Sequence, residues 1–231
     1  LLKIKRTLNN ACGLEILKYP TPELDRRIKL LKNYNIDVII DVGANIGQYG
    51  AELRNIGYQG KIISFEPTSE AFQKLQKTAS KDNFWEVHNM SLGESTINIS
   101  KNSVSSSILK DLLQLTESAP EATFIKKEVI IIKKLDSIFE DLKIKGKNIY
   151  LKIDTQGYEK MVLDGAVESL KNITGIQIEM ALIPSYEGSL TFEEMSANLK
   201  NLGFKLTTIE SGHYNKKTGK LLEVDGVFFK N

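Results

Sequence analysis

Apolar and polar positions along the chain follow two alternating periods, one typical of buried strands and one typical of helices. Residues 37–42 form a nearly continuous apolar run, as expected for a strand of a parallel sheet that is covered on both faces. Similar strand patterns occur at residues 61–65, 84–88, 148–154 and 173–179. Helical patterns separate them at residues 46–56, 69–78, 135–142, 158–170 (interrupted near Gly165) and 191–202. This alternation predicts an α/β fold in which helices cover both faces of a mostly parallel sheet.

The carboxyl-terminal part of the pattern differs from the rest, because two strands follow each other directly. Residues 204–210 and 221–230 have strand character, and the polar, turn-rich residues 211–219 join them. A connection this short predicts an antiparallel hairpin at one edge of the sheet.

Residues 95–132 break the alternation of strands and helices. Residues 96–100 and 128–132 resemble strands, and a Ser-rich segment and a helical pattern at 108–116 lie between them. We interpret 95–132 as an insertion over one end of the sheet. The chain is therefore divided into a lead-in at 1–35, whose basic and apolar start we expect to be solvated, and a single domain at 36–231.

Composition excludes several classes of protein. The 231 residues suit one α/β domain, and a net charge of +2 is too small for the footprint of a nucleic-acid binder. The single cysteine, Cys12, excludes an internal disulfide, and no apolar run has the length of a membrane span. We expect a cytoplasmic protein, without a prediction of its oligomeric state.

The strongest local motif is the segment Asp41–Gly47, which follows a buried strand and precedes a helix. Its glycines allow a ligand to approach the backbone closely, and Glu66 lies at the end of the next predicted strand. A carboxylate at that place can accept hydrogen bonds from the ribose hydroxyls of a nucleoside. The motif departs from the dinucleotide pattern, because Asn45 replaces the middle glycine and Asp41 would repel a pyrophosphate. The same carboxylate suits the ammonium group of a methionine moiety.

A second motif, residues 150–159, has an apolar strand that ends in Asp154, followed by Gly157 and Glu159. In open α/β sheets the ligand lies at the carboxyl ends of the strands. Four acids fall at such ends: Asp41, Glu66, Asp154 and Glu179.

These motifs resemble those of the FkbM-type methyltransferases. The resemblance includes Asp41–Gly47, Phe65–Pro67, Leu135–Asp136, Leu151–Asp154 with Gly157 and Glu159, and Ile178–Glu179, and extends from about Ile36 to Phe229. It implies a Rossmann-like class I methyltransferase with a seven-stranded sheet and an antiparallel last strand. It also implies S-adenosylmethionine as the donor and O-methylation of a hydroxyl on a sugar, a glycan or a small metabolite. The chain departs from the family at Gln156, where an acid is common.

The resemblance also assigns residue roles. Its cofactor contacts carry over to Asp41, Gly43, Asn45, Gly47 and Glu66, and Ser91 and Leu92 are expected to flank the adenine by their position. For the base that removes the acceptor's proton we rank Asp154 first, Glu179 second and Glu159 third, since Glu159 can instead support the loop. His88 is interpreted as a packed histidine, and Phe84 and Trp85 as core residues.

Three alternatives remain open at this stage. A metal held by Asp154 and Glu179 could lower the pKa of the hydroxyl instead of a carboxylate base, although two carboxylates make a weak magnesium site. The sheet could also belong to a nicotinamide-dependent oxidoreductase or to a nucleotide-binding module without catalysis.

Overall fold

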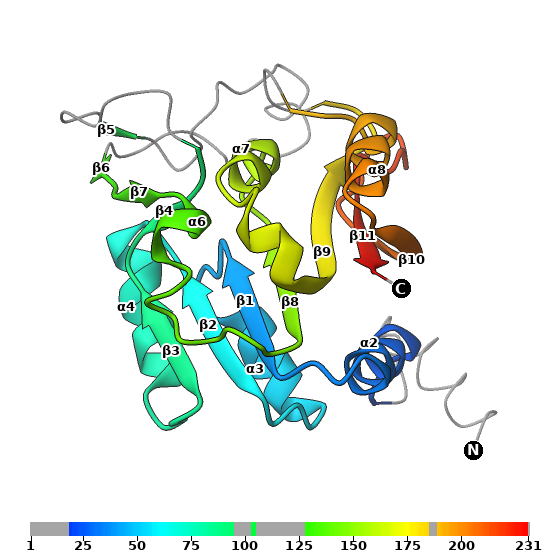
Figure 1. Cartoon of the computed structure of the whole chain (residues 1–231). Helices are drawn as coiled ribbons and strands as arrows, with labels where there is room; N and C mark the ends of the chain where they lie inside the picture. Colours follow the sequence, from blue (N-terminus) through cyan, green and yellow to red (C-terminus); the bar gives the residue numbers. More distant parts are fainter. Residues whose placement is uncertain (1–18, 95–102, 105–127, 185–188, 231) are drawn as a thin grey trace, which may run out of the picture.

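Seven strands form one mixed sheet at the centre of the molecule (Figure 1). The computed structural model describes residues 19–94, 103–104, 128–184 and 189–230. The strand order is β10-β11-β9-β8-β1-β2-β3, and every strand of this sheet except β11 runs in the same direction. The bounds are β1 Val38–Val42, β2 Lys61–Phe65, β3 Trp85–His88, β8 Ile149–Ile153, β9 Ile173–Ala181, β10 Lys205–Ser211 and β11 Glu223–Phe229. The mostly parallel sheet with its antiparallel last strand is confirmed.

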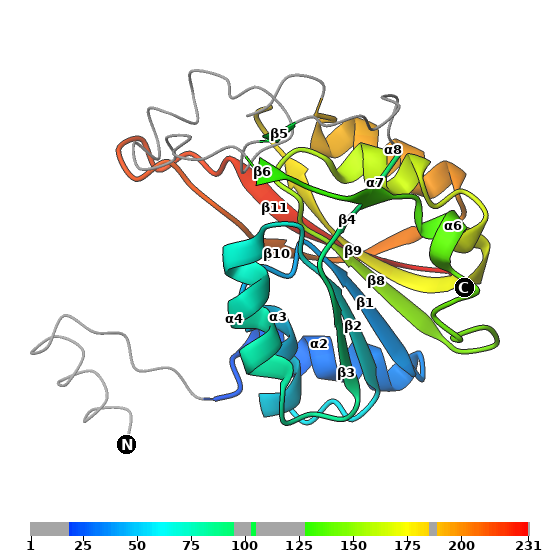
Figure 2. The same cartoon turned by 90° about the vertical axis from the view of Figure 1, so that its left-hand side faces the viewer.

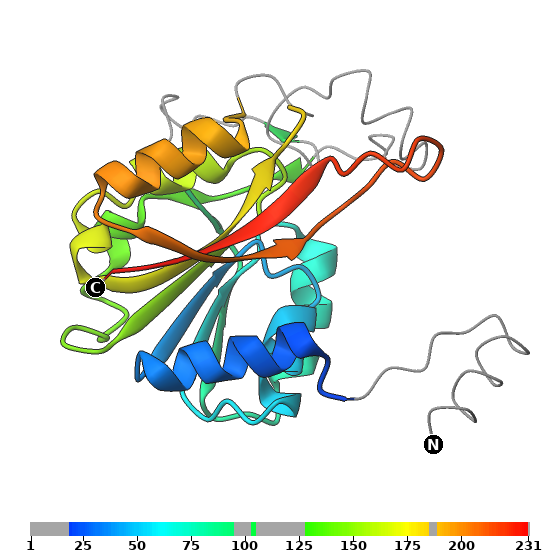
Figure 3. The same cartoon turned by 90° about the vertical axis from the view of Figure 1, so that its right-hand side faces the viewer.

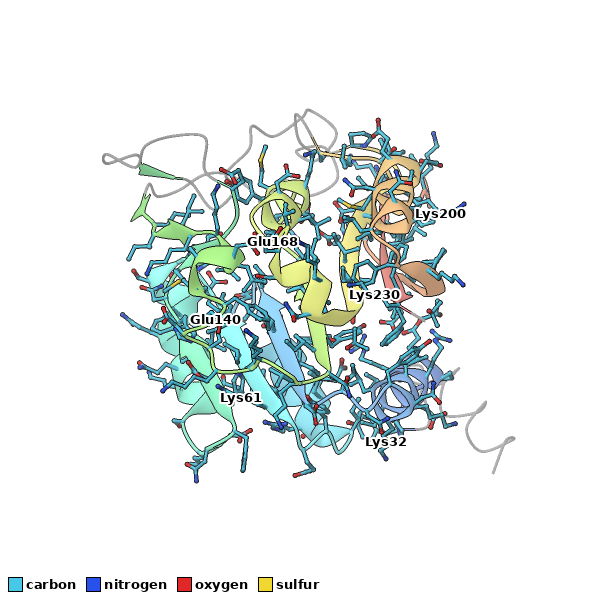
Figure 4. The ribbon with its side chains drawn as sticks, viewed as in Figure 1. Lys32, Lys61, Glu140, Glu168, Lys200 and Lys230 are labelled. Atoms are coloured by element: carbon cyan, nitrogen blue, oxygen red, sulfur yellow. The ribbon has the colours of Figure 1, made fainter. Side chains whose placement is uncertain are left out.

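Helices cover both faces of this sheet, as expected from the alternating pattern (Figures 2 and 3). One face carries α2 (Pro22–Asn33), α3 (Gln48–Asn55) and α4 (Ser69–Ala79), and the other carries α6 (Leu135–Ile138), α7 (Glu159–Asp164) and α8 (Phe192–Asn201). Successive strand residues point to opposite faces, so Ile39 packs in the core under α2, α3 and α4, while Ile40 packs in the other core. The charged residues Lys32, Glu168 and Lys200 lie exposed on the outer surfaces (Figure 4).

A row of polar residues crosses the otherwise apolar sheet near the carboxyl ends of its parallel strands. Asp41 of β1 pairs in register with Ser64 of β2 and with Lys152 of β8, and Lys152 pairs with Gln177 of β9. All four are buried. Buried polar groups persist where they bond to one another, so this row is a constraint on how the strands align.

The last two strands form the predicted antiparallel hairpin. Strand β11 lies between β9 and β10 and is antiparallel to both, which leaves β10 as the edge strand. Two acids on β11, Glu223 and Asp225, are thereby brought beside the end of β9, where Asp225 pairs in register with Glu179.

Helix α2 lies within the segment that the sequence analysis treated as a lead-in, and it was not predicted. Thr21 accepts a hydrogen bond from the amide of Leu24 at its start, and Leu24, Ile28 and Leu31 are buried. Arg27 extends from this helix to Glu210 of β10 at 2.5 Å and to Glu52 of α3 at 2.7 Å. The helix therefore packs on the same core as the sheet; residues 1–18 lie outside the described residues.

Some predicted elements have different lengths. The helix expected at 135–142 ends at Ile138, and the one at 158–170 is α7 followed by a short 3-10 helix, η1 (Ser169–Asn172), with the expected break at Gly165. The strand expected at 128–132 is two short strands, β6 (Glu128–Val129) and β7 (Ile132–Lys133), which pair with β5 (Ser103–Val104) and β4 (Ser91–Leu92). The strand expected at 96–100 and the helix expected at 108–116 lie outside the described residues.

Candidate active site

Four acids from different strands gather at the carboxyl ends of the parallel strands. Asp41 lies one residue before the end of β1, Glu66 and Asp154 directly follow β2 and β8, and Glu179 lies near the end of β9. Because β8 is placed between β1 and β9, Asp154 lies between the loop that follows β1 and Glu179. This edge is where open α/β sheets bind their ligands.

The turn after β1 requires glycine for a reason other than the one expected from the sequence. Gly43 has a φ of +80°, and a Cβ atom there would lie 1.8 Å from the carbonyl oxygen of Asp154. Gly47 has a φ of +91°, and its Cβ would lie 3.0 Å from a methyl carbon of Leu75 in α4. Both glycines are needed first for contacts within the chain. The contact at Gly43 joins the loop after β1 directly to the loop after β8.

Glu66 connects the loop after β1 to the loop after β2. Its Oε2 accepts a hydrogen bond from the amide of Asn45 at 2.9 Å, and its Oε1 accepts from the amide and the hydroxyl of Thr68. A carboxylate has about four acceptor positions, so one remains on Oε2. Glu66 is therefore suited to accept a further hydroxyl donor while it holds the Asn45 turn in place.

Asp41 does not have the surroundings that the sequence analysis expected. Its side chain is 0% exposed, lies 3.4 Å from the ammonium of Lys152 and accepts a hydrogen bond from Ser64 at 3.2 Å. The indole of Trp85 donates to the same Ser64 hydroxyl at 3.0 Å. Because this carboxylate is covered and already paired with a lysine, we propose that Asp41 anchors Lys152 in place of the expected direct contact with the ammonium group of a ligand.

Asp154 is the acid with the most open surroundings, with 36% of its side chain exposed. Its Oδ2 lies 3.3 Å from the Lys152 ammonium, and its Oδ1 accepts a hydrogen bond from the side-chain amide (Nε2) of Gln156 at 3.2 Å. The same Nε2 donates to Glu179 at 3.3 Å. The side-chain amide of Gln156 therefore bridges the two acids.

Glu159 supports the loop, which was the alternative role considered for it. Its Oε1 accepts hydrogen bonds from the amides of Thr155 and Gly157 and from the Thr155 hydroxyl, and the residue is buried. Burial raises the pKa of Glu159, and these bonds oppose the shift. The Glu159 carboxylate therefore stabilises the conformation of the loop after β8.

Glu179, Glu223 and Asp225 form an acidic group beside Asp154. Burial, followed by the charge of Asp154, raises the pKa of Glu179 and of Glu223. The same causes raise the pKa of Asp225 to about 6. A pocket beside this group is lined by Glu179 and Glu223 and by the apolar Leu190 and Met195.

The remaining predicted residues have varied surroundings. Ser91 and Leu92 are buried in the short strand β4, and Leu92 belongs to the main core, so their placement beside an adenine stays a prediction. His88 stacks on Phe65 and bonds to Glu86, as interpreted from the sequence. Trp85 is a core residue, but Phe84 is 65% exposed, so its assignment to the core was wrong.

Several residues of this edge were missed in the sequence. Lys152 lies in a motif that was noted only for its acid and glycine, Tyr49 and Gln177 lie just outside the motifs Asp41–Gly47 and Ile178–Glu179, and Asp225 belongs to none of the motifs. The hydroxyl of Tyr49 donates to the side-chain oxygen of Gln177 at 2.9 Å, and the Lys152 ammonium lies 5.3 Å from the centre of the Tyr49 ring. One signal was available: a charged residue in the middle of an apolar strand, as at Lys152, requires a buried partner.

Within the parts of the chain that the structure describes, no group of three or more His, Cys, Asp or Glu residues is suited to hold a metal ion. Nor does any helix in those parts have the length and apolarity to cross a membrane.

The sheet order, the glycine turn and the acids at the strand ends define a Rossmann-like methyltransferase fold. The chain belongs to the FkbM methyltransferase family, because the profile of the methyltransferase FkbM domain matches residues 41–206. The family's methyl donor is S-adenosylmethionine. No curated protein matches the chain.

Solved structures with this fold share little sequence with the chain. The methyltransferase FkbM from Methylobacillus flagellatus KT has 17% identity and a TM-score of 0.51, over 83% of this chain and 44% of that one. Magnesium protoporphyrin IX methyltransferase from Synechocystis PCC 6803, solved with bound S-adenosylmethionine, has 8% identity and a TM-score of 0.50, over 90% and 78%. These likenesses support the fold alone.

The contact between Gly43 and Asp154 predicts a strong effect of Gly43→Ala. The substitution places a methyl group against a carbonyl oxygen at a positive φ, and we expect it to lower the free energy of unfolding by about 3 kcal/mol or more. Gly57→Ala is the matched control, because its φ is +93° but nothing lies within 4 Å of the added Cβ. It should cost only about 1 kcal/mol in urea denaturation. Equal losses in the two variants would contradict the contact.

The raised pKa of Asp225 predicts a stability difference that depends on pH. The charged form is disfavoured in the folded state, so the stabilising contribution of this group is present below pH 3.8 and is lost as the pH rises through about 6. Asp225→Asn should therefore unfold with a free energy about 1–3 kcal/mol higher than wild type at pH 8, and with nearly the same value at pH 3.5. Asp25→Asn, on an exposed part of α2, controls for the substitution itself. A gain that is the same at both pH values would refute this explanation.

Proposed function

We propose that the protein transfers the methyl group of S-adenosylmethionine to a hydroxyl oxygen of a sugar, a glycan or a hydroxylated metabolite, with Asp154 as the general base. The observation that carries this proposal is the contact between Gly43 and Asp154. It joins the loop expected to hold the donor to the most exposed acid of the edge. The role of each residue below belongs to this proposal.

The donor would be held by the loop at residues 43–47 and by Glu66. The remaining acceptor position of the Glu66 carboxylate suits a ribose hydroxyl, and the exposed Asn45 places its backbone beside it. When bound, the sulfonium group supplies an already activated methyl group. The protein is then left with two tasks, which are to orient the acceptor oxygen and to accept its proton.

Asp154 suits the second task better than its neighbours. It faces solvent in part, and its Oδ2 lies 3.3 Å from the Lys152 ammonium. Glu179 is a poorer base at neutral pH, because burial and the Asp154 charge raise its pKa and favour a proton on it. Glu159 is occupied by its loop donors. The proton of the acceptor hydroxyl would therefore pass to Asp154 as the oxygen takes the methyl group.

An oxygen acceptor is supported by the groups that line the neighbouring pocket. The raised pKa values of Glu179 and Glu223 favour a bound proton, and a carboxyl group that carries one can donate a hydrogen bond while its other oxygen accepts. A polyhydroxylated acceptor presents both donors and acceptors, as this lining requires. Leu190 and Met195 would contact its apolar face.

The donor part of the proposal predicts a loss of affinity in Glu66→Gln. The amide keeps the size of the side chain but removes the negative charge, so S-adenosylhomocysteine should bind about 5–30-fold more weakly in calorimetry. Glu70→Gln, at an exposed position of α4, is the matched control and should bind as wild type does. Equal affinities in both variants, or binding of NADH in place of S-adenosylhomocysteine, would refute the donor site.

The catalytic part predicts that Asp154→Asn separates turnover from binding. Affinity for S-adenosylhomocysteine should stay within about threefold, while turnover should fall about 100-fold or more, because the asparagine cannot accept the proton. The acceptor for this assay comes from a screen of sugars and hydroxylated metabolites for release of S-adenosylhomocysteine. Asp164→Asn, in a surface ion pair on α7, is the control. Normal turnover in Asp154→Asn would remove Asp154 from the role of base.

A further inference from the structure

Lys152 is a buried cation at the centre of the candidate site. Its side chain is 7% exposed, and its ammonium lies 3.4 Å from Asp41 and 3.3 Å from Asp154. Burial alone would lower the pKa of Lys152, but the charges of Asp41 and Asp154 outweigh it, so the net shift is upward. Lys152 therefore carries its charge throughout the ordinary pH range and cannot serve as a base.

The two carboxylates around Lys152 differ in what they can do. Asp41 is 0% exposed and is also held by the Ser64 hydroxyl, which receives the indole N–H of Trp85. Its position is fixed by the core of the sheet. Asp154 is open to solvent and lies beyond the end of β8. The contacts thus connect the core, through Lys152, to the more exposed of the two carboxylates.

The other groups near Asp154 oppose a negative charge on it. From β9, Glu179 faces Asp154, and from β11, Glu223 and Asp225 do so; the charge of Asp154 raises the pKa of each of them. Further charged or titratable groups interact with these neighbours: Tyr49 of α3 with Lys152, Glu159 of α7 with Glu179, and Glu210 of β10 and Arg27 of α2 with Asp225. Arg27 is already paired with Glu210 and Glu52. Across the described ranges, Lys152 is the cation that contacts Asp154.

We propose that Lys152 is a positioning residue of the methyl transfer, which directs the Asp154 carboxylate and offsets the negative charges that face it from β9 and β11. This inference rests on the proposed function for its place in the reaction. Of the two acids that the side chain of Gln156 bridges, Asp154 is the one that contacts the Lys152 ammonium.

The test must remove the Lys152 charge without leaving Asp41 as an unpaired buried charge, since that would destabilise the fold. Lys152→Met combined with Asp41→Asn removes both charges, and Asp41→Asn alone is the matched control that keeps Lys152 beside Asp154. The carboxyl carbon of Asp154 is followed by NMR in the complete chain labelled with ¹³C-aspartate, and its signal is assigned by its absence in Asp154→Asn. This measurement needs neither donor nor acceptor.

In the double variant we expect the Asp154 signal to titrate about one pH unit or more above its position in Asp41→Asn, because the contacting cation is gone. Lys152→Arg in the Asp41→Asn background should return the titration most of the way. Lys152→Gln in that background gives the same comparison if methionine impairs folding. Identical titrations with and without the cation would overturn the inference.

The proposed function fails in a different measurement, so the two failures can be told apart. If no donor binds and no acceptor is methylated while the titration shifts as expected, the proposed methyl transfer is refuted, but the effect of the Lys152 charge on Asp154 is supported. If methyl transfer occurs, the acid limb of its pH–rate profile should move to higher pH in the double variant than in Asp41→Asn, by the same amount as the NMR titration. An unchanged acid limb would show that Lys152 has only a structural role.

Discussion

The close contact between Gly43 and the backbone of Asp154 is the constraint on which the candidate site depends. A Cβ atom at Gly43 would lie 1.8 Å from the Asp154 carbonyl oxygen, so the two loops fit together only with glycine at this position. The parallel pairing of β1 with β8 brings the loops to the same edge, and the amide of Asp154 donates to the carbonyl of Val42 at 3.0 Å. The proposed donor loop and the proposed base are therefore parts of one packed unit.

Charge in this unit is arranged by burial as much as by pairing. Asp41 and Lys152 lie in the sheet, where an isolated charge would be costly, and each is held by the other. Asp154 takes the outer end of this pair, while the acids on β9 and β11 are pushed toward their protonated forms. Neighbouring carboxyl groups are thus suited to different roles: Asp154 to accept a proton, and the acids of β9 and β11 to retain one.

The sequence was sufficient for the parts of the molecule that depend on local pattern and chain order. The apolar run before Gly43 and the acids after it predicted the sheet, its direction and the edge where Asp154 and Glu179 lie. It was not sufficient for contacts set by strand register, such as the buried ion pair between Asp41 and Lys152. The acids Glu223 and Asp225 were missed for the same reason, because only the antiparallel return of β11 brings them beside Glu179.

A crystal structure with S-adenosylhomocysteine would show whether the donor and Asp154 share this edge. We expect the ribose to bond to Glu66, the sulfur to face Asp154, and Asp41 to stay paired with Lys152 without touching the ligand. A ligand whose ribose bonds elsewhere, or whose sulfur faces away from Asp154, would contradict this expectation.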